Sequence, residues 1–377
     1  MFFVWRSFNL GDWRLAMTSL QRRPVAIRPA CELARVFHAL PPEPPYSRRA
    51  PRIERAERTV LARYYAMAAT SRQLPPSGVA LLDDACSVAG GVLIAASGEI
   101  VKESLANTGL EQRFGPFRRG NDGSLTARIW PMTRMAQQAG DFIFLRQTGD
   151  TSYGNWLIEM LPRLAIAAQF CDLSKFAVVV SWQSRAMEQI VRDSLGLFGI
   201  SPEQILPVGE SPVFFQRLVF PLPVAGHLLP KSQRAVEVLE SLPTRLPAPA
   251  TAPKRIYVTS EPGGRRLANE ADILNLLKPL GFTLLDPAQM SFTEQVQAFS
   301  QAEMIAGVCG DGLTNAAFAP RGVRVFVLTP PGKDEARLWG LTDLKQGPFF
   351  SLHGEDAGLH FSIDLAAFKS LLAEFAA

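Results

Sequence analysis

Apolar runs and amphipathic segments alternate along the last third of the chain. Short apolar runs are typical of buried strands, whereas apolar positions repeating every three or four residues indicate helices. The expected elements are, in chain order, strands at 255–260 and 282–285 around a helix at 270–280, a helix opening at the Ser291–Glu294 capping box, and strands at 304–308 and 323–328. Strands spaced by helices predict a parallel sheet with right-handed crossovers, and hence a Rossmann-like region.

The upstream pattern is more mixed and indicates several parts. Short apolar runs between residues 79 and 145 favour strands and hairpins, and strand–helix alternation returns after residue 152. A stretch with four prolines then interrupts the pattern before residue 254. The expected parts are an irregular N-terminal segment at 1–75, an α/β domain at 76–241, a proline-rich linker at 242–253, and a Rossmann-like domain with a terminal helix at 254–377.

The strand at 304–308 runs directly into a glycine turn that opens a helix. The first amides of a helix lack intrahelical partners and lie at the positive end of its dipole, so they attract anions. Gly310 and Gly312 carry no Cβ atom that would hold a phosphate away from the backbone. Because ligands bind beyond the carboxyl ends of parallel strands, this turn predicts a site for a phosphate-bearing ligand. A turn with only a packing role is the alternative.

Composition and charge narrow the kind of protein. The 377 residues are 47% hydrophobic, which is enough to bury two cores, and the net charge of +4 suits a small acidic ligand. The basic residues are dispersed and not interleaved with aromatic residues, so no nucleic-acid partner is expected. The four cysteines and four histidines show no metal-ligand spacing, and a reducing compartment is the default expectation.

Four ordered motifs carry a family resemblance. Their positions and sequences are 156–164, Trp-Leu-Ile-Glu-Met-Leu-Pro-Arg-Leu; 266–270, Arg-Leu-Ala-Asn-Glu; 292–302, a helix pattern with Glu-Gln, Phe and Ala; and 310–318, Gly-x-Gly-Leu-x-Asn-x-x-Phe. In this order they resemble glycosyltransferase family 61, which includes bacterial capsule and exopolysaccharide enzymes and eukaryotic xylosyl- and N-acetylglucosaminyltransferases. The resemblance spans about half of the chain.

The chain also departs from that family pattern. Asn155 and Cys309 stand where the family has histidines, and Asp311 replaces an alanine. Glu261 falls where many members carry an arginine, and Val327 where many carry a glutamate. Two hypotheses follow: an active glycosyltransferase, or a catalytically silent member that binds sugar nucleotides or polysaccharide in a biosynthetic complex. An unrelated Rossmann enzyme with another phosphate ligand is a third, although the Gly-x-Gly turn follows a later strand than a dinucleotide fingerprint does.

The resemblance implies both a fold and an activity. The fold is GT-B-like α/β, with two Rossmann-like domains facing across a cleft; 76–241 is the acceptor side and 254–377 binds the nucleotide sugar. In such folds a terminal helix often crosses back to the first domain, and the helix at 365–375 is a candidate. The activity is transfer of a sugar, with inversion, from a nucleotide-sugar donor to a polysaccharide or lipid-linked oligosaccharide acceptor.

Such a transfer needs stabilisation of the departing diphosphate and removal of a proton from the acceptor hydroxyl. Glu159 and Asp311 are the candidate catalytic bases, in no fixed order. Asp311 has two further interpretations, as a cap of its own helix and as a ligand of Mn²⁺ or Mg²⁺, although no ligand cluster demands a metal. The expected donor-binding residues are Arg163, Arg265, Arg266, Asn269, Gly310, Gly312, Leu313 and Asn315. The expected cleft-wall residues are Asn155, Trp156 and Cys309.

Asn155, Glu159 and Arg163 are spaced four residues apart, so they are expected on one helix face. One interpretation is a polar stripe on the cleft wall, and the other is a solvated Glu159–Arg163 ion pair. Pro162 lacks an N–H group and is expected to bend the helix.

No run of about 20 apolar residues predicts a membrane span. The aromatic and basic start at residues 1–20 lacks the pattern of a signal peptide and is a candidate for contact with a membrane surface. We expect a cytoplasmic protein, with a peripheral position at the inner membrane as the alternative. The sequence does not predict the oligomeric state.

Overall fold

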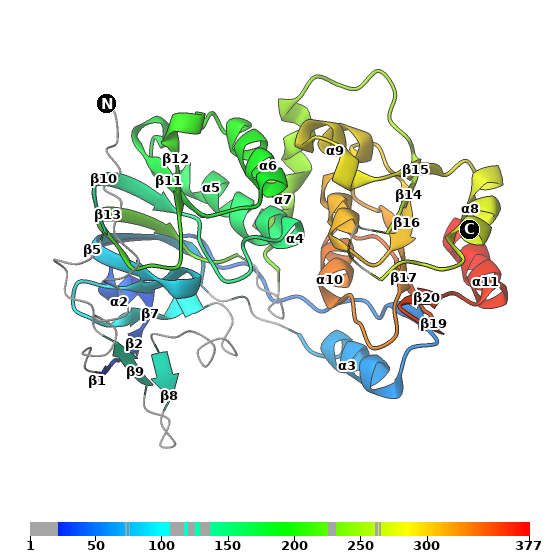
Figure 1. The fold of residues 1–377 in the computed structure, drawn as a ribbon, viewed down its shortest axis with the longest axis horizontal. Coiled ribbons are helices and arrows are strands. Elements are labelled where there is room, and N and C mark those ends of the chain that lie inside the picture. The colour runs from blue at the N-terminus through cyan, green and yellow to red at the C-terminus, as the bar shows by residue number, and fades with distance from the viewer. Residues whose placement is uncertain are drawn as a thin grey trace.

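The computed structural model describes residues 22–71, 74, 76–105, 117–119, 125–128, 136–224, 231–260, 263 and 265–377. Its described strands form two large sheets, with helices packed between and outside them (Figure 1). The α/β class that the alternating pattern predicts is therefore confirmed. The aromatic start of the chain and Glu261 lie outside the described residues.

The first sheet has a parallel half and an antiparallel half. Its strands are β2 (Ile27–Arg28), β3 (Val36–Ala39), β5 (Gly78–Val88), β6 (Val92–Ile94), β7 (Ile100–Val101), β10 (Ala136–Phe144), β11 (Ala177–Ser181), β12 (Ile205–Val208) and β13 (Val213–Pro221). The neighbours in the order β12-β11-β10-β13 are parallel, and β13 then pairs in antiparallel fashion with β5. Strand β5 leads on to β6, β7 and β2, and β3 also pairs with β5. Of the strands expected between 79 and 145, β5, β6 and β7 lie in this antiparallel half, whereas β10 lies in the parallel half.

The second sheet is parallel throughout. Its strands are β4 (Arg52–Glu54), β14 (Arg255–Val258), β15 (Thr283–Leu285), β16 (Met304–Val308), β17 (Arg324–Thr329) and β18 (Phe349–His353), in the order β15-β14-β16-β17-β18-β4. From β14 to β18 this is the 2-1-3-4-5 order of a doubly wound sheet, whose ligand crevice lies where the order reverses, between β14 and β16. The glycine turn follows β16 and therefore lies at this reversal point.

The helices expected from periodicity are present. They are α6 (Arg185–Gly196), α8 (Glu270–Leu277), α9 (Phe292–Phe299) and α11 (Leu365–Ala376). The Ser291 hydroxyl accepts from the Glu294 amide, which confirms the predicted capping box, and Asp364 caps α11 in the same manner. In the described ranges no helix has the length and apolar character needed to cross a membrane.

Like α3 (Arg58–Ala68) and α7 (Gln233–Ser241), helix α10 (Ala336–Leu344) was not predicted. Most of its residues are buried, including Leu338, Trp339 and Leu341. Because apolar residues surround the whole helix, its sequence lacks the one-sided pattern by which amphipathic helices are recognised. This helix carries Arg337, which contacts Asp311 beside the glycine turn.

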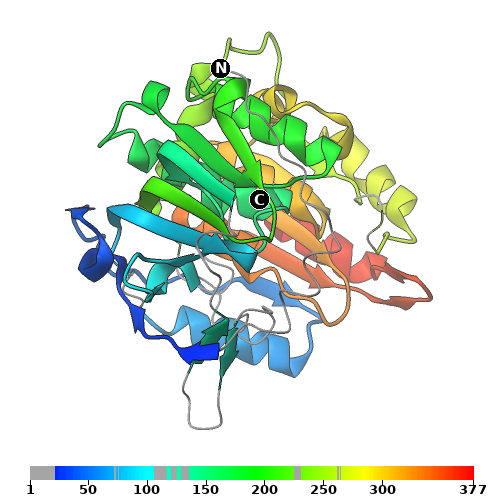
Figure 2. The same cartoon turned by 60° about the vertical axis from the view of Figure 1, so that its left-hand side comes forward.

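A layer of helices fills the space between the two sheets (Figures 1 and 2). It contains α5 (Leu161–Ala167), α6, α7 (Gln233–Ser241), α9 and α10, together with a 3-10 helix, η11 (Asp311–Phe318). A single cluster of buried apolar residues runs through this layer and includes Leu164, Val236, Phe292, Leu313 and Trp339. Residues on both sides of the predicted linker thus share one core.

The segment that crosses between the two sheets comes from the N-terminal end of the chain and not from the C-terminal end. Helix α11 packs against β18 and α8, where Phe368 stacks on Phe326, so the expectation that it crosses to the first sheet is wrong. Instead, the N-terminal segment crosses: β2 and β3 join the first sheet, and β4 joins the second beside β18. Helix α3 (Arg58–Ala68) follows and buries Tyr64 against Trp339, with ring centroids 5.2 Å apart.

The remaining elements are short. They are α2 (Ala30–Leu33), a small sheet of β1 (Arg22–Pro24), β9 (Leu125–Arg128) and β8 (Phe117–Arg119), and a hairpin of β19 (Glu355–Ala357) and β20 (His360–Ser362).

Candidate functional site

Glu159 lies in a helical run with a widened turn. The run consists of α4 (Tyr153–Asn155), a π-helical turn at Trp156–Met160 and α5. The amide of Leu161 donates to the carbonyl of Trp156, five residues earlier, just before Pro162. The bend expected at Pro162 therefore takes the form of a π-turn, which changes the simple four-residue spacing of the expected polar stripe.

The Glu159 side chain is almost completely buried, with 1% of its surface exposed. Its Oε2 accepts a hydrogen bond of 2.9 Å from Gln147 Nε2, whereas Oε1 has no partner among the described residues. Burial raises the pKa of this carboxyl group, and the nearby Lys231 and Arg337 oppose the rise. The solvated ion-pair interpretation is therefore wrong. A carboxyl group with a raised pKa and a free oxygen is suited to accept a proton.

We call the first sheet with helices α4 to α7 the first unit, and the second sheet with helices α8 to α11 and η11 the second unit. Arg163 and Trp156 lie inside the first unit. Arg163 donates to the carbonyl oxygens of Pro221 (2.8 Å) and Phe144 (3.3 Å), at the carboxyl ends of β13 and β10, and lies over the Phe220 ring. The indole N–H of Trp156 donates to Ser194 of α6. Both side chains are fully buried, so neither lines a surface in this structure.

The glycine turn is packed tightly against its neighbours. A Cβ atom on Gly312 would lie 3.2 Å from side-chain atoms of both Pro287 and Val258. The amide of Leu313 donates to the carbonyl of Gly310 within the turn. Close packing thus gives a direct reason for glycine at position 312, which matches the packing alternative for this residue.

Asn315 joins the two units. Its Nδ2 donates to Gln295 Oε1 at 2.7 Å, and its Oδ1 accepts from the hydroxyl of Tyr153. The Asn315 side chain is fully buried, and both ends of the amide have a partner within the chain. Its position between α9 and α4 is that of a clamp.

Asp311 bridges the second unit to the start of α4. Its Oδ1 lies 2.5 Å from Arg337 Nη2, and its Oδ2 accepts from the amide of Gly154 at 3.1 Å. Arg337 also donates to Asn155 Oδ1 at 3.1 Å. Asp311 therefore does not cap its own helix, and that interpretation is corrected. A guanidinium group already neutralises the carboxylate, so the residues present do not fit a divalent metal at this position.

Metal ligands are not gathered elsewhere in the described ranges either. No group of three or more His, Cys, Asp or Glu side chains there is arranged to hold a metal ion.

The residues that depart from the family pattern converge on the start of α10. Cys309 donates its S–H to Glu335, whose amide in turn donates to the Tyr64 hydroxyl. Asn155 and Asp311 both contact Arg337, two residues further on. Burial raises the pKa of the Cys309 thiol, and the Glu335 carboxylate raises it further, so this thiol is not a thiolate nucleophile. Val327 lies apart, buried in β17.

The other predicted donor-binding residues lie beside the β19–β20 hairpin. Arg265 donates to Asp356 and to the carbonyl of His360, and Asn269 exchanges two hydrogen bonds with the main chain of Ile363. Arg266 has an exposed side chain. Asn269 lies at the N-cap position of α8 but makes no side-chain cap hydrogen bond, because its side-chain amide bonds to the main chain of Ile363 instead.

Three residues that lie near Glu159 were missed by sequence reasoning: Gln147, Lys231 and Arg337. Gln147 follows β10, Lys231 precedes α7, and Arg337 is in α10. No motif marked any of them. Gln147 and Lys231 reach Glu159 through the folding of the residues before the predicted linker, whereas Arg337 comes from the residues after it.

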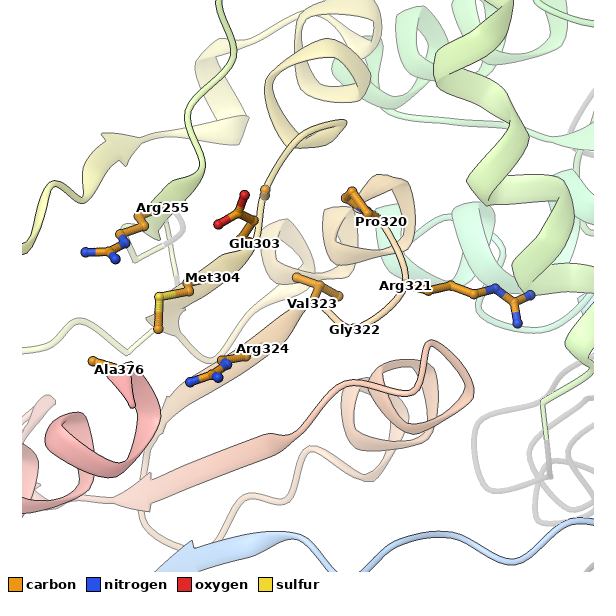
Figure 3. Close-up of a pocket in the computed structure, with 10 residues that line it drawn as sticks. Arg255, Glu303, Met304, Pro320, Arg321, Gly322, Val323, Arg324 and Ala376 are labelled. Carbon is orange, nitrogen blue, oxygen red and sulfur yellow. The ribbon is translucent and has the colours of Figure 1, made fainter.

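A pocket of about 280 Å³ lies at the opposite edge of the second sheet (Figure 3). It is lined at the starts of β14, β16 and β17, where Arg255 and Arg324 donate to the carbonyls of Leu280 and Phe375. These carbonyls end helical segments, so the arginines have a capping role there. The pocket is at the amino ends of the strands, away from the glycine turn and Glu159.

The chain was compared with known proteins. The family model described as Glycosyltransferase 61 matches residues 153–326, a region that begins at α4 and ends in β17. A search of curated proteins found no match. The matched region contains Glu159, the glycine turn and the motifs that suggested the family. Residues 153–326 thus match glycosyltransferase family 61, and transfer of a sugar from a donor to a glycan acceptor is the general activity that this match supports.

Proposed function

We propose that the protein transfers a sugar from a nucleotide-sugar donor to a polysaccharide or lipid-linked oligosaccharide acceptor, with inversion, and that Glu159 is the catalytic base. The observation that carries the proposal is the Glu159 carboxyl group, which is buried at the junction of the two units with one oxygen unpartnered. Inverting transfer in one step requires a base that accepts the proton of the acceptor hydroxyl as the glycosidic bond forms.

The choice between the two candidate bases rests on their partners. Asp311 shares its oxygens between Arg337 and the Gly154 amide, and an ion-paired carboxylate is a weak base. Glu159 keeps Oε1 available, and burial raises its pKa. In this proposal Asp311 holds the two units together, and Glu159 performs proton transfer.

The donor is proposed to bind at the reversal point of the second sheet, in a GT-B-like arrangement of two Rossmann-like domains. Support comes from the 2-1-3-4-5 strand order and from the position of the glycine turn beyond β16. Within the proposal, Gly310 and the exposed Arg266 contact the donor. Arg163, Asn269 and Asn315 act as structural clamps because their polar atoms are already bonded within the chain.

A second candidate function is a silent binding subunit of a biosynthetic complex. It is favoured by the contacts of Asn155, Cys309 and Asp311, three positions that differ from the family pattern and are bound to Glu335 and Arg337. Such contacts stabilise one closed arrangement of the two units.

The test begins with thermal unfolding in the presence of UDP, GDP, CMP and dTDP and their sugars. A ligand at about 100 times its Kd stabilises the folded state by about 2.7 kcal/mol, which gives a measurable rise in Tm. The donor that binds is then assayed for slow hydrolysis and for transfer to a lipid-linked glycan. Donor turnover supports the enzyme, and binding without turnover supports the silent subunit. Binding of none of these ligands contradicts the enzyme and favours the silent subunit.

A further inference from the structure

We propose that Arg48, Lys231 and Arg337 form a buried anion site that receives the diphosphate of the sugar donor. The inference rests on the proposed function and adds to it the residues that neutralise the leaving group. Arg48 and Arg337 lie outside the region that matches the family model.

The three cations lie together although they come from distant parts of the chain. Arg48 belongs to the crossing between β3 and β4, Lys231 immediately precedes the Ser232 cap of α7, and Arg337 is in the first turn of α10. The main-chain amide of Lys231 donates to the hydroxyl of Tyr46, two residues before Arg48, at 3.1 Å, and Arg48 lies over the ring of Trp339, two residues after Arg337. The positive charges of both arginines also lower the pKa of the Lys231 ammonium group, in addition to the larger effect of burial. The fold therefore concentrates positive charge at one place.

This charge is buried without sufficient compensation. Lys231 is 2% exposed and Arg48 is 5% exposed. The described residues offer neither side chain an ion-pair partner, and Arg48 Nε and Nη1 have no hydrogen-bond acceptor there. Buried charges are normally paired, because removal from water costs several kcal/mol per ion. Within the described residues, Arg48 therefore keeps buried donors that are free to bind an anionic ligand.

The surrounding carboxylates do not replace that anion. The negative charge of Glu159 raises the pKa of Lys231, but burial raises the pKa of Glu159 itself and so reduces its charge near neutral pH. Asp343 lies near Arg48 and accepts from the Arg49 amide. Asp311 neutralises one side of Arg337. Arg48 itself stacks over the Trp339 ring, 5.0 Å from its centroid, which fixes the plane of the guanidinium group without using its N–H donors.

The chemistry of the free donors indicates a phosphate-type ligand. Arginine presents a planar fork that fits two phosphate oxygens, and lysine supplies a compact positive charge. Arg337 donates to Asn155 and Asp311 through its two Nη atoms, so it contributes positive charge to the site and not a free donor fork. It is the most accessible member, with 17% of its side chain exposed, so the ligand enters from this side. Glu159 lies beside the same cations, which places the proposed base next to the proposed leaving group.

The test uses the full-length chain and inorganic pyrophosphate as the probe. Binding is measured by isothermal titration calorimetry, and unfolding by a thermal scan with and without pyrophosphate. The variants are Lys231→Met and Arg48→Met, with Lys345→Met as the matched control. Lys345 is also a fully buried lysine, but its ammonium group is paired with Glu240 at 2.9 Å.

We expect pyrophosphate to raise the Tm of the wild-type protein and of Lys345→Met. Its Kd should be at least tenfold weaker in Lys231→Met and in Arg48→Met. Without ligand, Lys231→Met should unfold at a higher temperature than the wild type because an unpaired buried charge is removed, whereas Lys345→Met should unfold at a lower temperature because Glu240 loses its partner.

Equal pyrophosphate binding in wild type and Lys231→Met would overturn the inference, as would no binding to the wild type. A fall in Tm for ligand-free Lys231→Met as large as that for Lys345→Met would contradict the uncompensated charge. Donor turnover without pyrophosphate binding removes this inference but leaves the proposed function. Pyrophosphate binding that depends on Lys231, without binding of any nucleotide sugar, removes the proposed function and leaves an anion site.

Discussion

Asn315 and Glu159 lie on segments that face each other, but the chain treats the two side chains differently. Asn315 and its neighbour Gln295 find partners within the chain for the polar atoms that form the clamp. Glu159 is equally buried, but one of its oxygens finds no hydrogen-bond partner among the described residues, and the same is true of two nitrogens of Arg48. An unpaired buried polar atom lowers the stability of the folded state. The region around Glu159 therefore carries a stability penalty that the region around Asn315 avoids.

The comparison teaches that burial alone does not separate structural from functional polar residues. The two kinds of residue are separated by whether each polar atom has a hydrogen-bond partner within the chain. A family motif residue whose atoms are all bonded contributes to the fold, whereas a buried group with free atoms is open to a ligand. Variants in the two regions should therefore fail in different ways.

The largest effect is expected at Glu159. Glu159→Gln keeps the shape of the side chain but removes the base, so kcat should fall by about 10²–10⁴-fold while Tm is unchanged or higher. Steady-state kinetics with the identified donor give the comparison. Glu303→Gln, which changes a carboxylate at the opposite sheet edge, serves as the control. A kcat within threefold of wild type in Glu159→Gln would show that the base lies elsewhere.

Arg163 should behave in the opposite manner. Arg163→Ala opens a cavity and leaves the Pro221 and Phe144 carbonyls without their donor, so the free energy of unfolding should fall by about 3 kcal/mol. Urea unfolding measures this change. Donor affinity, measured under conditions in which the variant is folded, should stay near the wild-type value; a normal stability with lost affinity would place Arg163 among the donor ligands.

The pH dependence sharpens the same contrast. The pKa of Glu159 is raised to about 7, so kcat/KM should rise by about tenfold per pH unit below that value and level off above it. The folded state binds this proton more tightly than the unfolded chain does. The contribution of Glu159 to the free energy of unfolding is therefore largest below its ordinary pKa and decreases as the pH rises toward 7. Unfolding curves at several pH values should show this decrease in wild type and not in Glu159→Gln.

A moderate effect is expected for the Asp311–Arg337 contact. A double-mutant cycle with Asp311→Asn and Arg337→Met should give a coupling energy in unfolding of about 1–2 kcal/mol, because the pair is largely enclosed and hydrogen-bonded. The exposed Lys254–Glu303 pair is the matched comparison and should give less than about 0.5 kcal/mol. Equal coupling in the two cycles would remove the special role of the Asp311 bridge.

The smallest effect is expected at Arg265. Its partner Asp356 has a 73% exposed side chain, so Arg265→Ala should change the free energy of unfolding by less than about 0.5 kcal/mol. Donor binding should also change little, as measured by thermal shift with the identified nucleotide. A large loss of donor affinity would restore Arg265 to the donor site that its sequence position suggested.

The sequence by itself determined the local elements and the family. Helix α9 with its Ser291 cap, helix α6 and strands β14 to β17 of the second sheet could be predicted because periodicity, capping and turn residues act over a few neighbours along the chain. The four motifs identified the family for the same reason: each is contiguous in sequence. Glu159 was found in this way, as part of a motif.

Only the tertiary structure decided which buried polar atoms have a hydrogen-bond partner and which do not. Arg48, Lys231 and Arg337 meet because the N-terminal segment crosses to the second sheet and α10 packs beside α7, and no local pattern encodes these pairings. The same holds for Arg163, whose motif position suggested a phosphate ligand until packing placed it on two strand carbonyls. Hydrogen-bond satisfaction is a property of segments brought together by folding, and a linear sequence does not display it.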